Sequence, residues 1–288
     1  MRHLAGIAVW LLALVATPAL AEAPESLRAL ESRLGYLAAS SPGNIGIAAL
    51  DLRTGELVAV HGDERFPMAS TMKVAVAANY LAQVEFGRRS LDERIGGRTA
   101  AQLMDAMIVR SDNHATDLLL RNLGGPRKVQ EWLEQRNIFG LRIDRNIAQL
   151  LAAKRDLWDV RDSSTPKAMV ELLKRLDNGT LLRPSSRSYL LGLMARCNTG
   201  KNRMRALLPA GTRVEHKTGT LSGYTSDVGF ITLPDGRRLA VAFFARSAPN
   251  RPYTIAAAAR AVYDGFVHYA RAPFAYPSYT TTTTYGTP

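Results

Sequence analysis

The sequence predicts an α+β fold in which a helical region interrupts a β-sheet. Strand-like runs occur near both ends of the chain, and the stretch between them is mostly helical in pattern. Elements in that order favour a sheet region flanked by helices and a separate helical lobe. We expect the functional site in the crevice between the two lobes, because binding sites prefer such positions.

The first expected elements are a helix and a β-hairpin. Leucines recur every three or four residues in Glu25 to Ala39, which is the spacing of one helix face. Ile45 to Leu52 and Glu56 to His61 are strand-like, and Arg53-Thr-Gly55 between them predicts the hairpin turn.

The helical region extends from Ser70 to about Cys197. Its clearest helices are Asp112 to Leu123, Arg127 to Arg136 and Pro166 to Leu176. Gly124-Gly-Pro126 predicts a break between the first two.

Three strands and a helix are expected to complete the fold. The strand-like runs are Thr212 to Thr218, Ser226 to Leu233 and Arg238 to Arg246, with Pro234-Asp-Gly236 as a turn. An alanine-rich helix is expected at Thr254 to Tyr269.

The N-terminus predicts a secretory signal at residues 1–21. Arg2 and His3 precede an apolar run from Leu4 to Ala16, and Ala19-Leu-Ala21 has the form of a cleavage site. We expect cleavage after Ala21 and a periplasmic location, with a retained membrane anchor as the alternative. The apolar run is short for a membrane span.

The remaining chain divides into a catalytic domain and a tail. The domain is expected at residues 22–271, with a sheet lobe at 22–68 and 205–271 and a helical lobe at 69–204. Residues 272–288 are rich in Thr and Tyr and are expected to be disordered.

The chain is strongly basic, with a formal net charge of +12 at pH 7. This positive charge has two possible interpretations. It gives the protein affinity for anionic cell-wall polymers, or it serves only to keep the protein soluble. The basic residues are scattered and no nucleic-acid-binding motif occurs, so we expect no nucleic-acid partner, and we expect a monomer. Cys197 is the only cysteine, which excludes an internal disulfide. It lies in a helix-like apolar stretch, Tyr189 to Asn198, which indicates a buried structural thiol.

Three short motifs occur in a fixed order, Ser70-Thr-Met-Lys73, Ser111-Asp-Asn113 and Lys217-Thr-Gly219. The spacing of Ser70 and Lys73 places both side chains on one helix face, where the amine can activate the hydroxyl as a nucleophile. The trio is the pattern of class A β-lactamases and penicillin-binding proteins. The chain resembles that superfamily over most of its length after the signal.

The resemblance implies a five-stranded antiparallel sheet with flanking helices, an all-helical lobe, and a serine hydrolase that needs no cofactor or metal. It implies four catalytic residues, namely Ser70, Lys73, Ser111 and Lys217. It implies four substrate-binding residues, namely Asn113, Thr218, Gly219 and Thr220. The Thr220 N–H would complete an oxyanion hole with that of Ser70.

Simpler roles remain open for the same residues. Ser70 is also suited to cap a helix N-terminus, and so is the Ser-Asp-Asn segment. His114 and His216 flank two of the motifs, but they lack metal-ligand spacing, and we interpret them as packing or surface residues.

The chain departs from the family in the Ω loop, where class A enzymes carry a Glu within E-x-x-L-N. If Asp144-Arg145 matches the family's Asp-Arg, Ile147 stands at the Glu position and Leu151 at the Asn position. Residues 142–162 contain no Glu, while Arg145 and Asp162 are present for the ion pair that closes such loops. Asp156 and Asp159 are the remaining carboxylates of the loop's second half.

The expected function is therefore an acyl-enzyme at Ser70 formed with β-lactams or peptidoglycan-type peptides. Without the general base, ester hydrolysis should be slow, because such a base typically contributes about 10²–10⁴-fold. A D,D-peptidase-like penicillin-binding protein and a covalent binding module without turnover are the rival functions.

Overall fold

The computed structural model describes residues 25–41 and 43–271. The predicted signal at 1–21 and the predicted tail at 272–288 lie outside these residues. The division of residues 22–271 into lobes at the stated boundaries remains a prediction.

The centre of the fold is a five-stranded antiparallel sheet, which confirms the expected fold class. Its order is β2-β1-β9-β8-β7, so strands from both ends of the chain are paired in one sheet. The strands are β1 (Asn44–Asp51), β2 (Leu57–Val60), β7 (Val214–Leu221), β8 (Tyr224–Thr232) and β9 (Arg238–Arg246).

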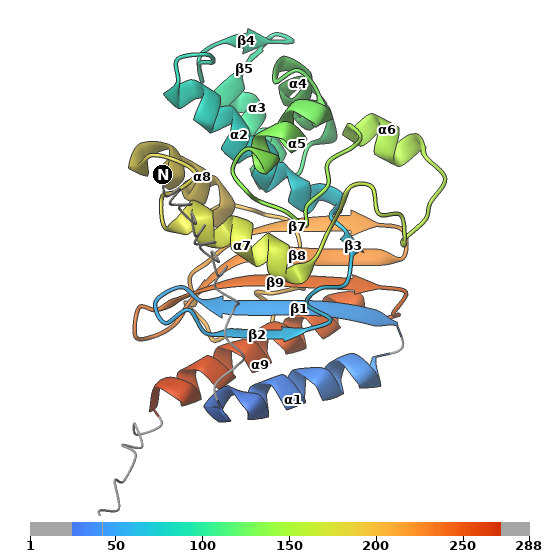
Figure 1. The fold of residues 1–288 in the computed structure, drawn as a ribbon, viewed down its shortest axis with the longest axis vertical. Coiled ribbons are helices and arrows are strands. Elements are labelled where there is room, and N and C mark those ends of the chain that lie inside the picture. The colour runs from blue at the N-terminus through green and yellow to red at the C-terminus, as the bar shows by residue number, and fades with distance from the viewer. Residues whose placement is uncertain (1–24, 42, 272–288) are drawn as a thin grey trace, which may run out of the picture.

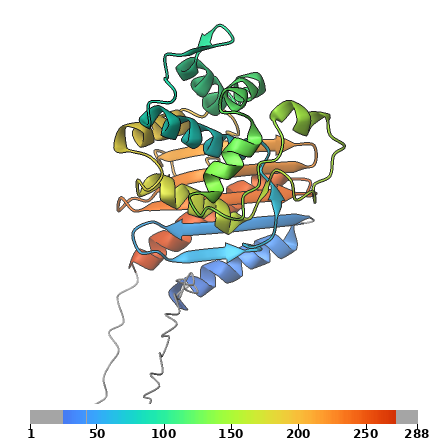
Figure 2. The same cartoon turned by 45° about the horizontal axis from the view of Figure 1, so that its top comes forward.

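Both faces of the sheet are covered. Figures 1 and 2 show α1 (Glu25–Ser40) and α9 (Arg251–Arg271) together on one face, and the other helices on the opposite face. Neighbouring residues of β9 alternate between the two cores, since Phe243 packs with α1 and α9 while Phe244 packs with the helical side. Double burial explains why β9 is almost entirely apolar.

The helical side is built from short helices. These are α2 (Lys73–Glu85), α3 (Ala100–Val109), α4 (Asn113–Asn122), α5 (Pro126–Glu134), α6 (Ile147–Ala152), α7 (Pro166–Asp177) and α8 (Pro184–Ala195). A 3₁₀ turn η1 (Ala69–Met72) leads into α2. The two-residue strands β3 (Phe66–Pro67) and β6 (Ser163–Ser164) pair with each other, as do β4 (Arg94–Ile95) and β5 (Arg98–Thr99).

Local sequence explains where these helices begin. Thr99 and Gln102 form a reciprocal capping box at α3, and Asn146 and Gln149 form another at α6. The Thr165 side chain caps α7, whose first residue is a proline. Within the described residues, no helix is both long enough and apolar enough to span a bilayer.

Two expectations about elements were wrong. The stretch from Tyr189 to Asn198 is not one helix, because α8 ends at Ala195 and buried Cys197 follows it in a turn. Strand β7 continues past Thr218 to Leu221, where it pairs with Tyr224 of β8. The Lys217-Thr-Gly219 motif therefore lies inside an edge strand, where antiparallel pairing holds its backbone.

Candidate active site

The predicted nucleophile Ser70 lies in η1 and is partly exposed. It does not cap α2, because the N-cap position of that helix is Met72, and no side chain makes a capping hydrogen bond there. The Met68 N–H donates to the carbonyl of Asp162 at 2.8 Å, and the Thr71 hydroxyl donates to the Met68 carbonyl at 2.7 Å. Ala69 has a left-handed backbone with φ of +48°, a strained conformation of the kind found at functional sites.

Lys73, at the first position of α2, is completely buried. Its amine donates to the Ser111 carbonyl at 2.7 Å, to Asn113 Oδ1 at 2.8 Å and to Ser111 Oγ at 3.2 Å. Burial, reinforced by the charge of Lys217, lowers the pKa of Lys73 to about 7. A large fraction of the amine is therefore neutral at neutral pH and can accept a proton.

Ser111 connects the two predicted catalytic lysines. Its hydroxyl is 3.2 Å from Lys73 Nζ and 2.9 Å from Lys217 Nζ. A left-handed φ of +59° turns the chain at Ser111, and the Asp112 side chain then caps α4 at the Ala115 N–H. The segment therefore caps a helix, as one interpretation predicted, and it also places the Ser111 hydroxyl between the two lysines.

Lys217 is buried in β7, and burial lowers its pKa to about 8. Its amine also donates to the carbonyl of Thr218 at 2.9 Å. The Thr218 hydroxyl lies 2.5 Å from the Thr199 hydroxyl and is almost completely buried. Thr220, further along the strand, is exposed.

Gly219 allows β7 to pass close to the nucleophile turn. A Cβ atom at this position would lie 2.7 Å from the Met68 carbonyl oxygen and 2.4 Å from Ser226 Oγ. Either approach is too close for a side chain, so only glycine fits. Since β7 pairs only with β8 in the sheet, its other edge faces η1.

Arg203 belongs to this site, although the sequence did not indicate it. Its guanidinium donates to the carbonyls of Gly219 and Ser226, both at 3.0 Å, and to Thr220 Oγ1 at 2.7 Å. Burial lowers its pKa. No sequence motif surrounds Arg203. Only its hydrogen bonds to β7 in the folded structure distinguish it from the chain's many other basic residues.

The Ω loop is closed as expected. Asp162 accepts from Arg145 Nε at 2.5 Å and from the backbone N–H groups of Asp144 and Arg145 at 2.8 and 3.0 Å. Asp159 also pairs with Arg145, at 3.2 Å. These contacts confirm the predicted ion pair between Arg145 and Asp162.

Ile147, at the position expected for the catalytic Glu, is buried in the larger apolar core. Its backbone N–H donates to Asp117 Oδ1 at 2.7 Å, and that of Ala148 donates to Asp117 Oδ2 at 3.0 Å. Leu151, at the expected Asn position, is half exposed. Neither side chain can hold or activate a water molecule.

The loop carboxylates are engaged elsewhere. Asp159 pairs with Arg161 and Arg145, and the hydrogen bonds from Arg161 hold its pKa at about 2, which makes it a weak base. Asp144 pairs with Arg142, and Asp156 accepts from the backbone N–H of Trp158.

The two histidines lie apart from the proposed chemistry. His114 is exposed, whereas His216 is buried between Asp227 at 2.7 Å and Arg205 at 3.1 Å. In the part of the chain that the structure describes, no group of three or more His, Cys, Asp or Glu side chains could hold a metal ion.

Similarity to known proteins agrees with this geometry. Residues 29–266 match the family model for the β-lactamase enzyme family. A carbapenem-hydrolyzing β-lactamase, KPC, of Klebsiella oxytoca is 33% identical over 248 residues, which are 77% of this chain and 84% of that protein. β-Lactamase CTX-M-8 of Citrobacter amalonaticus is 32% identical, covering 82% of this chain and 89% of the relative.

Solved structures show the same fold. An ancestral class A β-lactamase superposes with a TM-score of 0.78 at 36% identity, covering 82% of this chain and all of the other. A β-lactamase from Chitinophaga pinensis gives 0.77 at 28% identity, covering 83% and 99%. The chain is a member of the β-lactamase family of serine hydrolases, in its class A branch.

Proposed function

We propose that Ser70 attacks the carbonyl of a β-lactam or a peptidoglycan-type amide and retains the acyl group as a slowly hydrolysed ester. The observation that carries this proposal is the hydrogen-bonded chain Lys73–Ser111–Lys217, in which Lys73 begins the helix that follows the η1 turn of Ser70, together with apolar Ile147 at the position expected for a general base.

Acylation needs a base, an oxyanion site and a proton donor. Neutral Lys73 takes the Ser70 proton while Oγ bonds to the carbonyl carbon. The backbone N–H groups of Ser70 and Thr220 stabilise the oxyanion. The proton then passes through the Ser111 hydroxyl to the leaving nitrogen as the C–N bond breaks.

Substrate binding follows from the cations and hydroxyls along β7. Lys217 and the Thr218 and Thr220 side chains would receive a substrate carboxylate, with Arg203 adding positive charge through its contact with Thr220. The exposed side chain of Asn113 would bind the substrate amide while its Oδ1 holds Lys73.

Deacylation lacks a comparable base. Ile147 supplies no proton acceptor, and the Asp159 carboxylate is a weak one. Water must then attack the ester without a carboxylate to activate it, and the acyl-enzyme accumulates.

The test is single- and multiple-turnover kinetics with a chromogenic cephalosporin, followed by intact mass. We expect a stoichiometric burst, a persistent covalent adduct, and loss of both in Ser70→Ala. Equal adduct formation by Ser70→Ala would refute the nucleophile assignment.

The same measurement separates the rival functions. A sustained rate on a D-alanyl-D-alanine peptide would favour a D,D-peptidase-like enzyme, and a burst with no later rate would favour a covalent binding module.

We further propose that the chain is exported to the periplasm after cleavage at Ala21 and associates with anionic wall polymers. The signal-like N-terminus supports export, and the formal charge of +12, which becomes +11 when Arg2 is removed with the signal, supports association with anionic polymers. N-terminal sequencing of the exported protein checks the cleavage, and pelleting with purified cell wall at low and high salt checks the association.

A further inference from the structure

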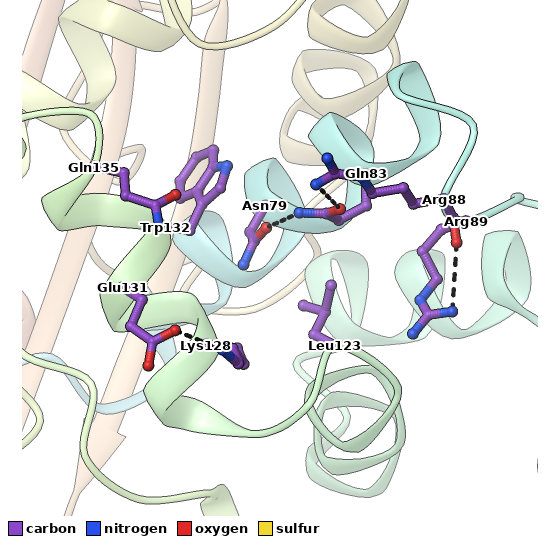
Figure 3. Close-up of a pocket in the computed structure, with 9 residues that line it drawn as sticks. All are labelled: Asn79, Gln83, Arg88, Arg89, Leu123, Lys128, Glu131, Trp132 and Gln135. Carbon is purple, nitrogen blue, oxygen red and sulfur yellow. Dashed lines mark hydrogen bonds and ion pairs between the residues drawn. The ribbon is translucent and has the colours of Figure 1, made fainter.

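The described residues line a cavity in the helical lobe that is partly open to solvent and includes none of the proposed active-site residues. It lies between α2, the segment after α4, and α5, and its volume is about 460 Å³ (Figure 3). Small-molecule sites are typically about 300–1,000 Å³, so a metabolite-sized ligand fits.

Two guanidinium groups at this cavity have no acidic partner. Arg88 donates to Gln83 Oε1 at 3.5 Å and Arg89 donates to backbone carbonyls, but neither forms an ion pair with a carboxylate of the described residues. The cavity's one acidic residue, Glu131, is already paired with Lys128 at 2.8 Å and with Arg127. The lining therefore has an excess of two positive charges.

A buried donor in the wall is unsatisfied. Trp132 is only 4% exposed, and its Nε1 has no hydrogen-bond partner. The guanidinium of Arg136 covers its ring at 4.5 Å, and Figure 3 shows the indole nitrogen on the side that faces α2. An unpaired buried N–H is unfavourable, and a ligand or water acceptor in the cavity would relieve it.

Asn79 contributes a second donor. It is 2% exposed, and its Oδ1 accepts from Gln83 Nε2 at 3.3 Å, so the amide nitrogen is left to donate. Figure 3 shows this nitrogen turned towards α5. The cavity thus combines two unpaired cations, two inward donors and amide groups that bind hydroxyls.

We propose that this cavity is a second binding site, for a small phosphorylated polyol. A phosphomonoester carries close to two negative charges at neutral pH, which match the charges of Arg88 and Arg89, and guanidinium groups bind phosphate oxygens in bidentate geometry. The N–H groups of Trp132 and Asn79 bind hydroxyl or ester oxygens of the polyol.

Calorimetric titration of the full chain with glycerol 3-phosphate, inorganic phosphate and glycerol tests the site. The probes separate the phosphate from the polyol. The indole N–H resonance of Trp132, assigned by its loss in Trp132→Phe, reports whether binding occurs in the cavity. The Ser70→Ala protein is titrated in parallel. Because this variant lacks the proposed nucleophile, binding to it tests the cavity independently of the proposed catalytic function.

We expect saturable binding of glycerol 3-phosphate, weaker binding of phosphate, none of glycerol, and a shift of the Trp132 resonance. Arg88→Gln with Arg89→Gln should weaken binding about 10-fold or more, and Trp132→Phe by several-fold. Arg121→Gln, which removes the charge of an exposed side chain on α4 outside the cavity, should bind like the wild type.

Three outcomes would overturn the proposal. These are the absence of saturable binding, equal weakening by Arg121→Gln, and a Trp132 resonance that does not move while heat is released. Equal affinity for phosphate and glycerol 3-phosphate would refute recognition of the polyol, and the cavity would then be a binding site for phosphate alone.

Discussion

The backbone N–H of Ile147 donates to the carboxylate of Asp117 at 2.7 Å, and this contact ties the Ω loop to α4. The adjoining Ala148 N–H binds the other carboxylate oxygen, so Asp117 caps α6 with both of its oxygens. The loop keeps its closed geometry without any acidic side chain at residue 147. The contact between Asp117 and the loop backbone therefore does not depend on the side chain at residue 147.

Restoring the missing base should restore hydrolysis. We expect Ile147→Glu with Leu151→Asn to raise the deacylation rate about 10-fold or more while acylation stays nearly unchanged. Ile147 is 3% exposed, so the matched control is Ile147→Gln with Leu151→Asn, which makes the same steric change without a base. A wild-type enzyme that already turns over penicillin at ~10 s⁻¹, near the enzyme median, would contradict the premise.

Asp117→Ala should destabilise the first turn of α6. Loss of a helix cap costs about 0.5–2 kcal/mol, and the amides of Ile147 and Ala148 should lose protection from hydrogen exchange. Asp117→Asn keeps one acceptor oxygen and should retain part of that protection. Equal exchange in the wild type and Asp117→Ala would mean that the carboxylate does not hold the helix.

The acylation rate should show a bell-shaped dependence on pH. Below about 7, Lys73 becomes protonated and loses its capacity as a base, so the rate falls as the pH falls. Above about 8, Lys217 loses its proton and its attraction for a substrate carboxylate, so the rate falls as the pH rises. Stopped-flow acylation over pH 5 to 10 measures both limbs.

A neutral ester substrate is the control for this pH profile. It should keep the acidic limb, because its attack still needs Lys73, and it should lose the alkaline limb. If the acylation rate of the neutral ester falls equally at alkaline pH, the charge of Lys217 contributes to the chemical step and not to binding of a substrate carboxylate.

Lys217→Ala should weaken acylation by carboxylate-bearing β-lactams more than by neutral esters. A charge-assisted hydrogen bond contributes about 1.5–3 kcal/mol, which corresponds to about 10–150-fold in kcat/KM. Because Lys217 also contacts Ser111 Oγ, some loss is expected for both substrates, and the ratio is the informative quantity. An unchanged ratio would rule out carboxylate recognition by this amine.

Local patterns in the sequence were sufficient for most elements. The strand-like apolar run from Arg238 to Arg246 predicted β9 with the correct bounds, and Pro166 marked the start of α7 correctly. Such signals come from residues close together in the chain, where burial periodicity and capping act directly. The η1 turn at Ser70 was missed, because a 3₁₀ turn with a left-handed Ala69 carries no distinctive local pattern.

The sequence by itself determined the order of the motifs, the family, and the absence of a Glu from the Ω loop. Only the tertiary structure placed Ser111 between Lys73 and Lys217, gave Arg203 its contact with β7, and joined Asp117 to Ile147. These contacts connect residues far apart in the chain. Their electrostatic consequences, such as the lowered pKa of Lys73, depend on burial and on charges that approach only when the two lobes pack together.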